Sequence, residues 1–333
     1  MLALQILFLV VGMLLLVKGA DWFVDGSAGV AHKCKISTLV IGLTVVAFGT
    51  SAPELAVSVT SAIQKSTEIA IGNVVGSNIV NILLILGVSA LIRPLPVQKS
   101  SLKLDFPVML LATALLIVLG LWQYTLQWWD GLILLAVFSV YMTILLTQAK
   151  KEQKKLKATA DAQSPAVMEI APKGKLQAWF FRMKKYVWFL IVLIAVGLGM
   201  VVGGSMLFVD AAKYIASYAG VPERVIGLTV VAIGTSLPEL VTSVVAAIKN
   251  ESDIAVGNII GSNIFNIFVV AGASSLFYPL TFTQMNLIDA LVAFGAAALL
   301  YFFSLMKGDK IRRYAGVIML LCCIGYYVYL FMN

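Results

Sequence analysis

Two glutamates placed inside apolar sequence are the residues most able to do chemistry in this chain. Glu54 lies in GLTVVAFGTSAPEL, which begins at Gly42, and Glu239 lies in GLTVVAIGTSLPEL, which begins at Gly227. An ionised carboxylate at such a depth in apolar sequence costs several kcal/mol when unpaired. No Lys or Arg is near either glutamate in sequence, so a bound cation is the simplest source of the missing positive charge. A structural hydrogen-bonding role for the two acids is the alternative.

The side chains around the glutamates are rich in hard oxygen atoms. Each acid follows a Thr-Ser pair and precedes a GNxxGSNxxN segment, so the candidate ligands occur in matched pairs: Thr50 and Thr235, Ser51 and Ser236, Asn73 and Asn258, Asn78 and Asn263, Asn81 and Asn266. Oxygen ligands without Cys or His in the motifs favour calcium, sodium or magnesium over zinc or copper. Magnesium fits least well because it sheds water reluctantly. Two carboxylates balance one calcium ion, and sodium ions competing for the same oxygens would give exchange.

Glycine and proline bracket each Thr-Ser pair. Gly49 and Pro53 do so in the first motif, and Gly234 and Pro238 do so in the second. Proline removes a backbone donor and clashes with the preceding turn, which predicts a break in each helix. We expect the carbonyl groups of residues 47–50 and 232–235 to be released there and to face inward as ligands. Asn73 and Asn258 are expected to bridge helices rather than to bind ions.

The two motifs belong to a longer internal duplication. Of the 50 positions from Ile41 to Ala90, 29 are identical to their partners between Ile226 and Ser275, without a gap and at a constant offset of 185 residues. Self-similarity of this length indicates that the chain contains two related halves. Two halves that each carry one buried acid predict a single site at their interface.

Composition places these halves in a membrane. Hydrophobic residues make up 61% of the chain, charged residues 12%, and the mean hydropathy is +0.98. Continuous apolar runs of this kind indicate spanning helices and exclude a water-soluble fold or a barrel. The expected class is an all-α polytopic membrane protein, with the three cysteines as packing residues because no CxxC pair occurs. The ten predicted spans fall at residues 1–24, 36–64, 69–92, 105–122, 131–149, 186–208, 224–248, 254–277, 286–305 and 314–332.

This pattern divides the chain into a first five-helix repeat at residues 1–149, a linker at 150–185 and a second repeat at 186–333. The linker is expected to be flexible and cytoplasmic, with regulatory ion or protein binding as the alternative. The first span lacks the charged flank and cleavage site of a signal peptide and is expected to be retained. Loops after the odd-numbered spans hold 20 of the 24 Lys and Arg residues, which predicts that both termini lie outside. This topology accounts for the net charge of +8 without a nucleic-acid partner.

Three acidic or basic residues outside the motifs receive structural interpretations. Asp25 and Asp210 correspond across the repeats and are expected near span ends, where interfacial solvation or a lysine partner is favoured over ion binding. His32 is expected to be solvated in a cytoplasmic loop.

An odd number of spans separates each element from its repeat partner, so the two halves should have opposite orientations in the bilayer. Inverted repeats with broken helices are typical of secondary transporters, whose substrate sites lie near the midplane. A passive cation channel is one alternative, and an intramembrane enzyme is another. The motifs contain no histidine that could act as a general base, and no GxxxxGK[ST] loop suggests ATP as an energy source.

The paired GxTxxAxGTSxPE and GNxxGSNxxN motifs resemble the α-repeats of the sodium/calcium exchanger family, within the cation/calcium antiporter superfamily, and most closely its bacterial members. The motif resemblance covers residues 41–90 and 226–275, and the ten-span plan extends it over the chain. It implies a calcium-for-sodium antiporter of the inner membrane, working as a monomeric transport unit without a cofactor. Proton coupling remains the alternative, because two close carboxylates repel each other in an empty site.

The resemblance also implies a role for each matching residue. The ion ligands would be Glu54, Glu239, Thr50, Thr235, Ser51, Ser236, Ala47, Ala232, Ser77, Ser262, Asn81 and Asn266. The first and sixth spans would slide over the packed remainder, with the glycines of residues 196–199 and 202–205 forming a smooth moving face. Many relatives carry aspartate at the position of Asn266, where the potassium-dependent branch uses the acid. Neutral Asn266 therefore argues against potassium dependence.

Overall fold

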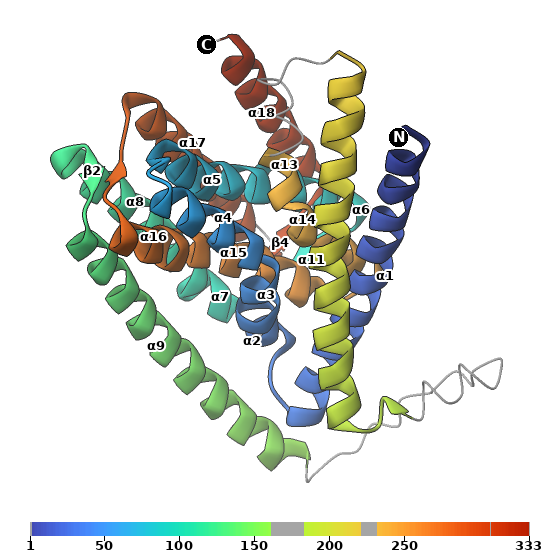
Figure 1. Ribbon diagram of the computed structural model, residues 1–333. Coiled ribbons are helices and arrows are strands. Elements are labelled where there is room, and N and C mark those ends of the chain that lie inside the picture. Colours follow the sequence, from blue (N-terminus) through green and yellow to red (C-terminus); the bar gives the residue numbers. More distant parts are fainter. Residues whose placement is uncertain (1, 161–182, 221–231, 307, 333) are drawn as a thin grey trace.

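The computed structural model describes residues 2–160, 183–220, 232–306 and 308–332, and within them nearly all of the chain is helical (Figure 1). Eight helices are long and apolar enough to cross a membrane, and a ninth span is formed by the pair 38–50 and 52–63, bent by 46°. The tenth expected span, 224–248, is described only from residue 232 onward. The all-α polytopic fold is confirmed.

The helices of the first half, in chain order, are α1 (Leu2–Cys34), α2 (Thr38–Ile41), η1 (Gly42–Val46), α3 (Ala47–Thr50), α4 (Ala52–Ile63), α5 (Thr67–Val80), η2 (Asn81–Leu86), α6 (Gly87–Ile92), α7 (Lys99–Lys103), α8 (Asp105–Gln123) and α9 (Trp128–Ala160). Those of the second half are α11 (Val187–Tyr218), α13 (Ala232–Thr235), α14 (Leu237–Ile248), α15 (Ser252–Phe265), η4 (Asn266–Ala271), α16 (Gly272–Phe277), α17 (Gln284–Leu305) and α18 (Arg313–Met332). The segments η1, η2 and η4 are π-helical.

Three helices are longer than the sequence predicted. α1 and α11 each run about ten residues past their expected ends, because small residues such as Gly26 and Ala31 of α1 are buried there rather than solvated. α9 continues to Ala160, since the lysines, the glutamate and the glutamine of residues 150–160 are good helix formers. The flexible linker expected from residue 150 is therefore wrong up to Ala160, and its remainder, residues 161–182, lies outside the described residues. His32 is exposed but lies in the last turn of α1, not in a loop.

The most buried helices come from the two duplicated segments. In the most apolar 18 residues of each span, 94% of residues are buried for Ser252–Phe277 and 72% for its repeat partner Thr67–Ile92, whereas only 17% are buried for α1. α5 with η2 and α15 with η4 therefore form the centre of the molecule. α1, α9, α11 and α18 lie around it, and α1 and α11 stand side by side along one flank (Figure 1).

Two short antiparallel ribbons join the halves. β1 (Leu95–Pro96) pairs with β4 (Lys310–Ile311), and β2 (Thr125–Leu126) pairs with β3 (Leu280–Thr281). The repeat offset of 185 residues maps β1 onto β3 and β2 onto β4, so the two ribbons are equivalent under the duplication. Each ribbon connects two loops that the span count places on the same side of the membrane. This arrangement supports two halves of opposite orientation.

α1 and α11 are antiparallel and pack through glycines. A Cβ added to Gly19 would lie 2.8 Å from the Gly197 carbonyl oxygen, and one added to Gly197 would lie 2.7 Å from the Gly19 carbonyl oxygen. Gly12 and Gly204 face each other in the same reciprocal way. Gly199 has no atom within 4 Å of such a Cβ. The glycines of α11 were expected to face the packed remainder, which is wrong: those in close contact bind the two outer helices to each other.

Candidate functional site

The site begins at the break between α3 and α4. Ser51 leaves the helical conformation with φ −83° and ψ 6°, and Ser236 does the same at the related break with φ −88° and ψ 7°. Pro53 has no N–H for the Gly49 carbonyl four residues earlier, so that carbonyl loses its helical donor. The Ala47 carbonyl still accepts a hydrogen bond from the Ser51 amide at 3.0 Å. The expectation that the break releases the Ala47 carbonyl is therefore wrong.

The two glutamates are fully buried and differ in their surroundings. Oε1 of Glu239 accepts hydrogen bonds from Ser51 Oγ at 2.9 Å and from Ser262 Oγ at 3.5 Å, so one serine of each repeat donates to the same carboxylate oxygen. Both carboxylate oxygens of Glu54 and the Oε2 atom of Glu239 have no hydrogen-bond partner in the described part of the chain. No ion pair to either glutamate occurs within the described residues. Buried acids in this condition need an added positive charge or a proton.

Further buried oxygens lack a donor nearby. Ser236 Oγ, Asn81 Oδ1 and Asn266 Oδ1 have no hydrogen-bond partner among the described groups. Asn81 begins η2, which packs against α14, and Asn266 begins η4, which packs against α4. Each of these asparagines thus lies beside the helix that carries the other repeat's glutamate. Buried polar atoms are normally satisfied, and a group of unsatisfied oxygens without a basic residue fits a hard cation.

Two asparagines hold the broken helices to the buried ones. Asn258 Nδ2 donates to Ser243 Oγ at 2.9 Å, and its Oδ1 accepts from Thr50 Oγ1 of the other repeat at 3.0 Å. Asn73 makes the related contacts, to Ser58 Oγ at 2.9 Å and with Thr235 Oγ1 at 3.5 Å. The prediction that Asn73 and Asn258 bridge helices is confirmed.

Three of the remaining expected ligands, Ser77, Ser262 and Thr50, are buried. Ser77 and Ser262 are buried at related positions on α5 and α15, and Ser262 Oγ donates to the Ala47 carbonyl at 3.4 Å. Thr50 is buried, Thr235 is half-buried, and Ala232 begins α13. Sequence analysis missed Ser58 and Ser243, although their identity in both copies, four residues after each glutamate, was a usable signal.

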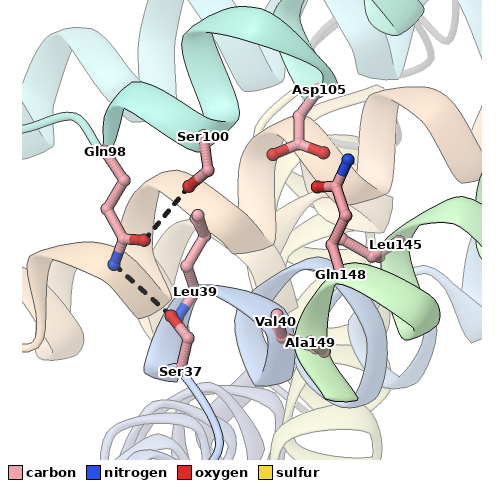
Figure 2. A pocket seen from close by; sticks show the side chains of 9 residues that line it. All are labelled: Ser37, Leu39, Val40, Gln98, Ser100, Asp105, Leu145, Gln148 and Ala149. Carbon is pink, nitrogen blue, oxygen red and sulfur yellow. Dashed lines mark hydrogen bonds between the residues drawn. The ribbon is translucent and has the colours of Figure 1, made fainter. Parts of the chain in front are cut away.

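Asp105 is a buried acid outside this site. Asp105 accepts a hydrogen bond from Tyr141 at 3.0 Å and borders a cavity of about 20 Å³, room for one water molecule, between α2, α8 and α9 (Figure 2). Asp289 and Tyr326 form a similar pair at 3.0 Å in the second half. Tyr326 is the repeat partner of Tyr141, whereas Asp289 precedes Ala290, the repeat partner of Asp105, by one residue. A tyrosine–aspartate contact in each half indicates a structural role in joining the last two helices of that half.

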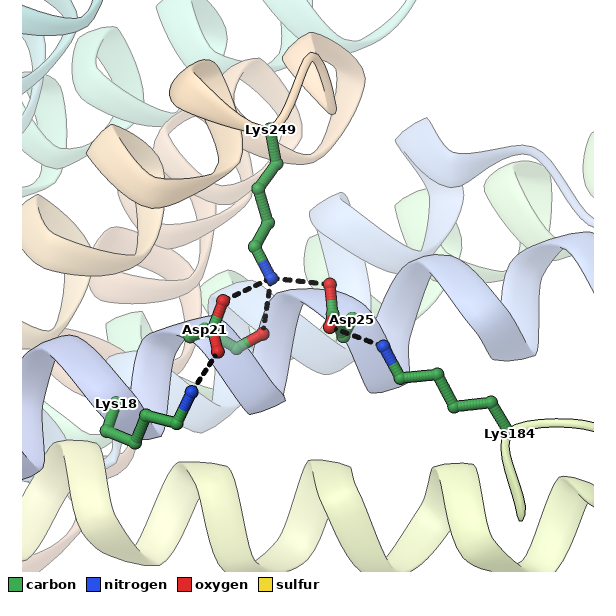
Figure 3. A network of polar contacts seen from close by, with 5 residues as sticks. All are labelled: Lys18, Asp21, Asp25, Lys184 and Lys249. Carbon is green, nitrogen blue, oxygen red and sulfur yellow. Dashed lines mark hydrogen bonds and ion pairs between the residues drawn. The ribbon is translucent and has the colours of Figure 1, made fainter. Parts of the chain in front are cut away.

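Asp25 takes part in an ion-pair network (Figure 3). Its carboxylate binds Lys184 at 2.6 Å and Lys249, which also binds Asp21 of the same helix. The prediction that Asp25 has a lysine partner is therefore confirmed, although Asp25 lies inside α1 and not near its end. Asp210 is largely exposed and lies 3.9 Å from Lys213.

Comparison with known proteins agrees with this geometry. A family model described as sodium/calcium exchanger protein matches residues 4–147 and 189–332. The chain belongs to the sodium/calcium exchanger family. It is 35% identical to the sodium/calcium exchanger MaX1 of Methanosarcina acetivorans, over 99% of both chains, and 37% identical to the putative antiporter CaxA of Alkalimonas amylolytica, over 98% of both. A solved structure of the sodium-calcium exchanger NCX_Mj, soaked with 2.5 mM Na⁺ and 0.1 mM Ca²⁺, has a TM-score of 0.81 and 35% identity, covering 98% of this chain and 99% of that one.

As a member of the exchanger family, the chain is a transporter and an integral membrane protein, not an enzyme. Its two family matches leave out the central segment between residues 147 and 189. The unsatisfied oxygens described above lie within the residues that the two family matches cover. The family assignment and the site geometry therefore concern the same residues.

Proposed function

We propose that this protein exchanges calcium for sodium across the membrane at one site built from both repeats. The observation that carries the proposal is the pair of buried glutamates, one from each repeat, whose free carboxylate oxygens have no basic partner among the described residues. Two carboxylates balance one calcium ion, and sodium ions can use the same oxygens. Competition for these oxygens couples the two fluxes.

Glu54 and Glu239 are the central ligands in this proposal. Hydroxyl or amide oxygens of Thr50, Thr235, Ser51, Ser236, Ser77, Ser262, Asn81 and Asn266 complete the coordination, with the carbonyl of Ala232 and the second lone pair of the Ala47 carbonyl, whose first lone pair accepts from the Ser51 amide. The names of the relatives support calcium and sodium as the exchanged ions, because MaX1 and NCX_Mj are called sodium/calcium exchangers.

Alternating access would come from movement of α1 and α11 against the rest of the molecule. α1 packs along α14, whereas the related pair α11 and α4 is barely in contact within the described residues. This asymmetry supports a structure closed on one side of the site. In the proposed topology of two five-helix repeats, both termini lie outside, the central segment lies in the cytoplasm, and a single chain transports without ATP.

The test uses proteoliposomes loaded with sodium and diluted into sodium-free buffer containing calcium. We expect calcium uptake that depends on the outward sodium gradient and is abolished by Glu54→Gln or Glu239→Gln. Glu68→Gln is a matched control, because Glu68 is an exposed acid in the first turn of α5. Robust sodium-dependent uptake by either site variant would contradict the assignment, and uptake driven by protons in place of sodium would change the coupling ion.

A further inference from the structure

Four asparagines form a cluster in which the hydrogen bonds cross between the two repeats. Asn81 Nδ2 donates to Asn263 Oδ1 at 3.3 Å, and Asn266 Nδ2 donates to Asn78 Oδ1 at 3.1 Å. All four side chains are buried. Each repeat thus receives the amide hydrogens of the other, so the two hydrogen bonds are equivalent under the duplication.

These hydrogen bonds decide which end of each amide remains available. An asparagine side chain presents either an acceptor oxygen or a donor NH₂ group, and the two ends have nearly the same shape. Because the Nδ2 atoms of Asn81 and Asn266 are engaged, their Oδ1 atoms are the ends left without a partner. A cation accepts the oxygen end and is repelled by the NH₂ end.

We propose that Asn78 and Asn263 are positioning residues that hold the amide oxygens of Asn81 and Asn266 toward the transported cation. This inference rests on the proposed function. The backbone supports it, because the π-helical segments η2 and η4 begin at Asn81 and Asn266. π-Helical turns inside α-helices occur frequently at functional sites.

The two positioning residues are not held equally. Asn78 Nδ2 donates to the Asn263 backbone carbonyl at 3.1 Å, whereas Asn263 Nδ2 faces the Met109 sulfur at 3.8 Å, a weaker acceptor. Asn78 is therefore fixed more firmly. Its removal should disturb the site more than removal of Asn263.

The experiment measures calcium and sodium binding to purified protein together with exchange in proteoliposomes. We expect Asn78→Leu to weaken calcium binding about tenfold and Asn263→Leu about threefold, the loss of one oriented ligand at 1.4 kcal/mol per tenfold change. In an Asn266→Ala background, Asn78→Leu should have no further effect, because its target amide is gone. Asn286→Ala is a control, since Asn286 is a buried amide in the capping box of α17, outside both motifs.

Additive effects of Asn78→Leu and Asn266→Ala would overturn the inference and leave the proposed function intact. Failure of the unmodified protein to exchange sodium for calcium would instead overturn the proposed function. If Asn78→Leu does not fold, Asn78→Ala and the Asn263 variant provide the same cycle through Asn81→Ala.

A second inference concerns the ion pairs at the end of the molecule near Lys184. Lys249 directly follows α14 and binds Asp21 and Asp25 of α1, so it ties the outer helix to the helix that carries Glu239 (Figure 3). The repeat offset places Gln64, at the end of α4, opposite Asp210 of α11 on the other side. A neutral residue therefore stands where Lys249 would be needed for the same ion pair.

We infer that the Lys249 ion pairs stabilise the packing of α1 against α14 and favour the conformation in which this side of the site is closed. The packing agrees, because α1 lies along α14 while α11 and α4 are barely in contact. An interaction made in only one of two conformations shifts their populations toward that one. Among the residues that the structure describes, an ion pair thus joins an outer helix to a glutamate-bearing helix on this side of the site and not on the other.

The test is hydrogen–deuterium exchange of α1 in nanodiscs. We expect Lys249→Gln, which copies the related residue, to speed exchange over residues 18–34 by about two- to fivefold, as expected for partly exposed ion pairs. Gln64→Lys should slow exchange in α11, because it supplies on α4 the lysine that could pair with Asp210 when α11 closes against α4. Lys185→Gln is the control at an exposed neighbouring lysine. Unchanged exchange in both Lys249→Gln and Gln64→Lys would overturn the inference.

Discussion

Asn258 shows how one residue can support both repeats. It is fully buried and contacts Thr50, Ser243 and the Glu239 backbone carbonyl, whereas the related Asn73 is half-buried with a longer contact to Thr235. We expect Asn258→Ala to lower the free energy of unfolding by about 2–4 kcal/mol, because it leaves buried hydroxyl groups unsatisfied. Asn73→Ala should cost about half as much. Thermal unfolding in detergent measures both, and equal losses would contradict the explanation.

Glu251, in the turn between α14 and α15, gives a pH-dependent prediction. Burial raises the pKa of its carboxyl above the usual 4.5, and Asp253 and Asp25 raise it further against the opposing effects of His32 and Lys249. Because the folded protein holds this proton more tightly than the unfolded chain, stability is greater at low pH and falls as pH rises from about 4.5 through the folded pKa. Glu251→Gln should remove that fall. Melting temperatures of the two proteins should therefore converge at acid pH and diverge toward neutrality.

At the scale of elements, the α1–α11 contact depends on the absence of side chains. We expect Gly197→Ala to destabilise the protein by about 1–3 kcal/mol, since its Cβ would overlap the backbone of α1 at 2.6–2.7 Å. Gly199→Ala, two residues away on the open face, should be neutral or slightly stabilising because alanine favours the helix. Melting temperatures in detergent compare the two. Similar losses would show that helix propensity, not contact, sets the effect.

The breaks at Pro53 and Pro238 belong to the same scale. Pro53→Ala returns an N–H to the Gly49 carbonyl and should reduce the 46° bend of this span. We expect folding to be retained and calcium uptake to fall at least tenfold, because Ser51 would move away from Glu239. Pro238→Ala should act in the same direction. Uptake at the rate of the unmodified protein would show that the bend is not needed.

The sequence predicted the order of the described spans but not their lengths. Hydropathy located each apolar core, yet it could not show that α1 and α11 continue about ten residues past their expected ends, because that extension depends on their mutual contact. Propensity alone could have indicated the helical extension of α9. The π-helical segments had no signal in composition, since they arise from how buried helices pack.

At the scale of the molecule, inter-repeat contacts should hold the halves together without a covalent link. The ribbons, the glycine contact of α1 with α11 and the asparagine cluster all cross between repeats. We expect two fragments, residues 1–170 and 171–333, to copurify when coexpressed and to retain calcium exchange. Either fragment expressed alone should be unstable. Recovery of a folded single fragment would contradict this prediction.

The duplicated motifs predicted most of the residues of the candidate site, because the two glutamates and their oxygen-rich neighbours are identical in the two copies of the repeat. Which residue each of these side chains takes as its hydrogen-bond partner was not predictable from the sequence. Ser51 serves the glutamate of the opposite repeat, and the Ala47 carbonyl keeps its helical partner. Which end of an amide faces the site depends on partners 182 and 188 residues away in the chain.

The crossed ribbons carry an evolutionary implication. β1 finds its partner in β4 and β2 finds its partner in β3, so neither half completes a ribbon within itself. An ancestor with a single repeat could have formed the same contacts only with a second copy inserted in the membrane in the opposite orientation. Fusion of two gene copies would then have joined the two subunits of such a dual-topology dimer into one chain.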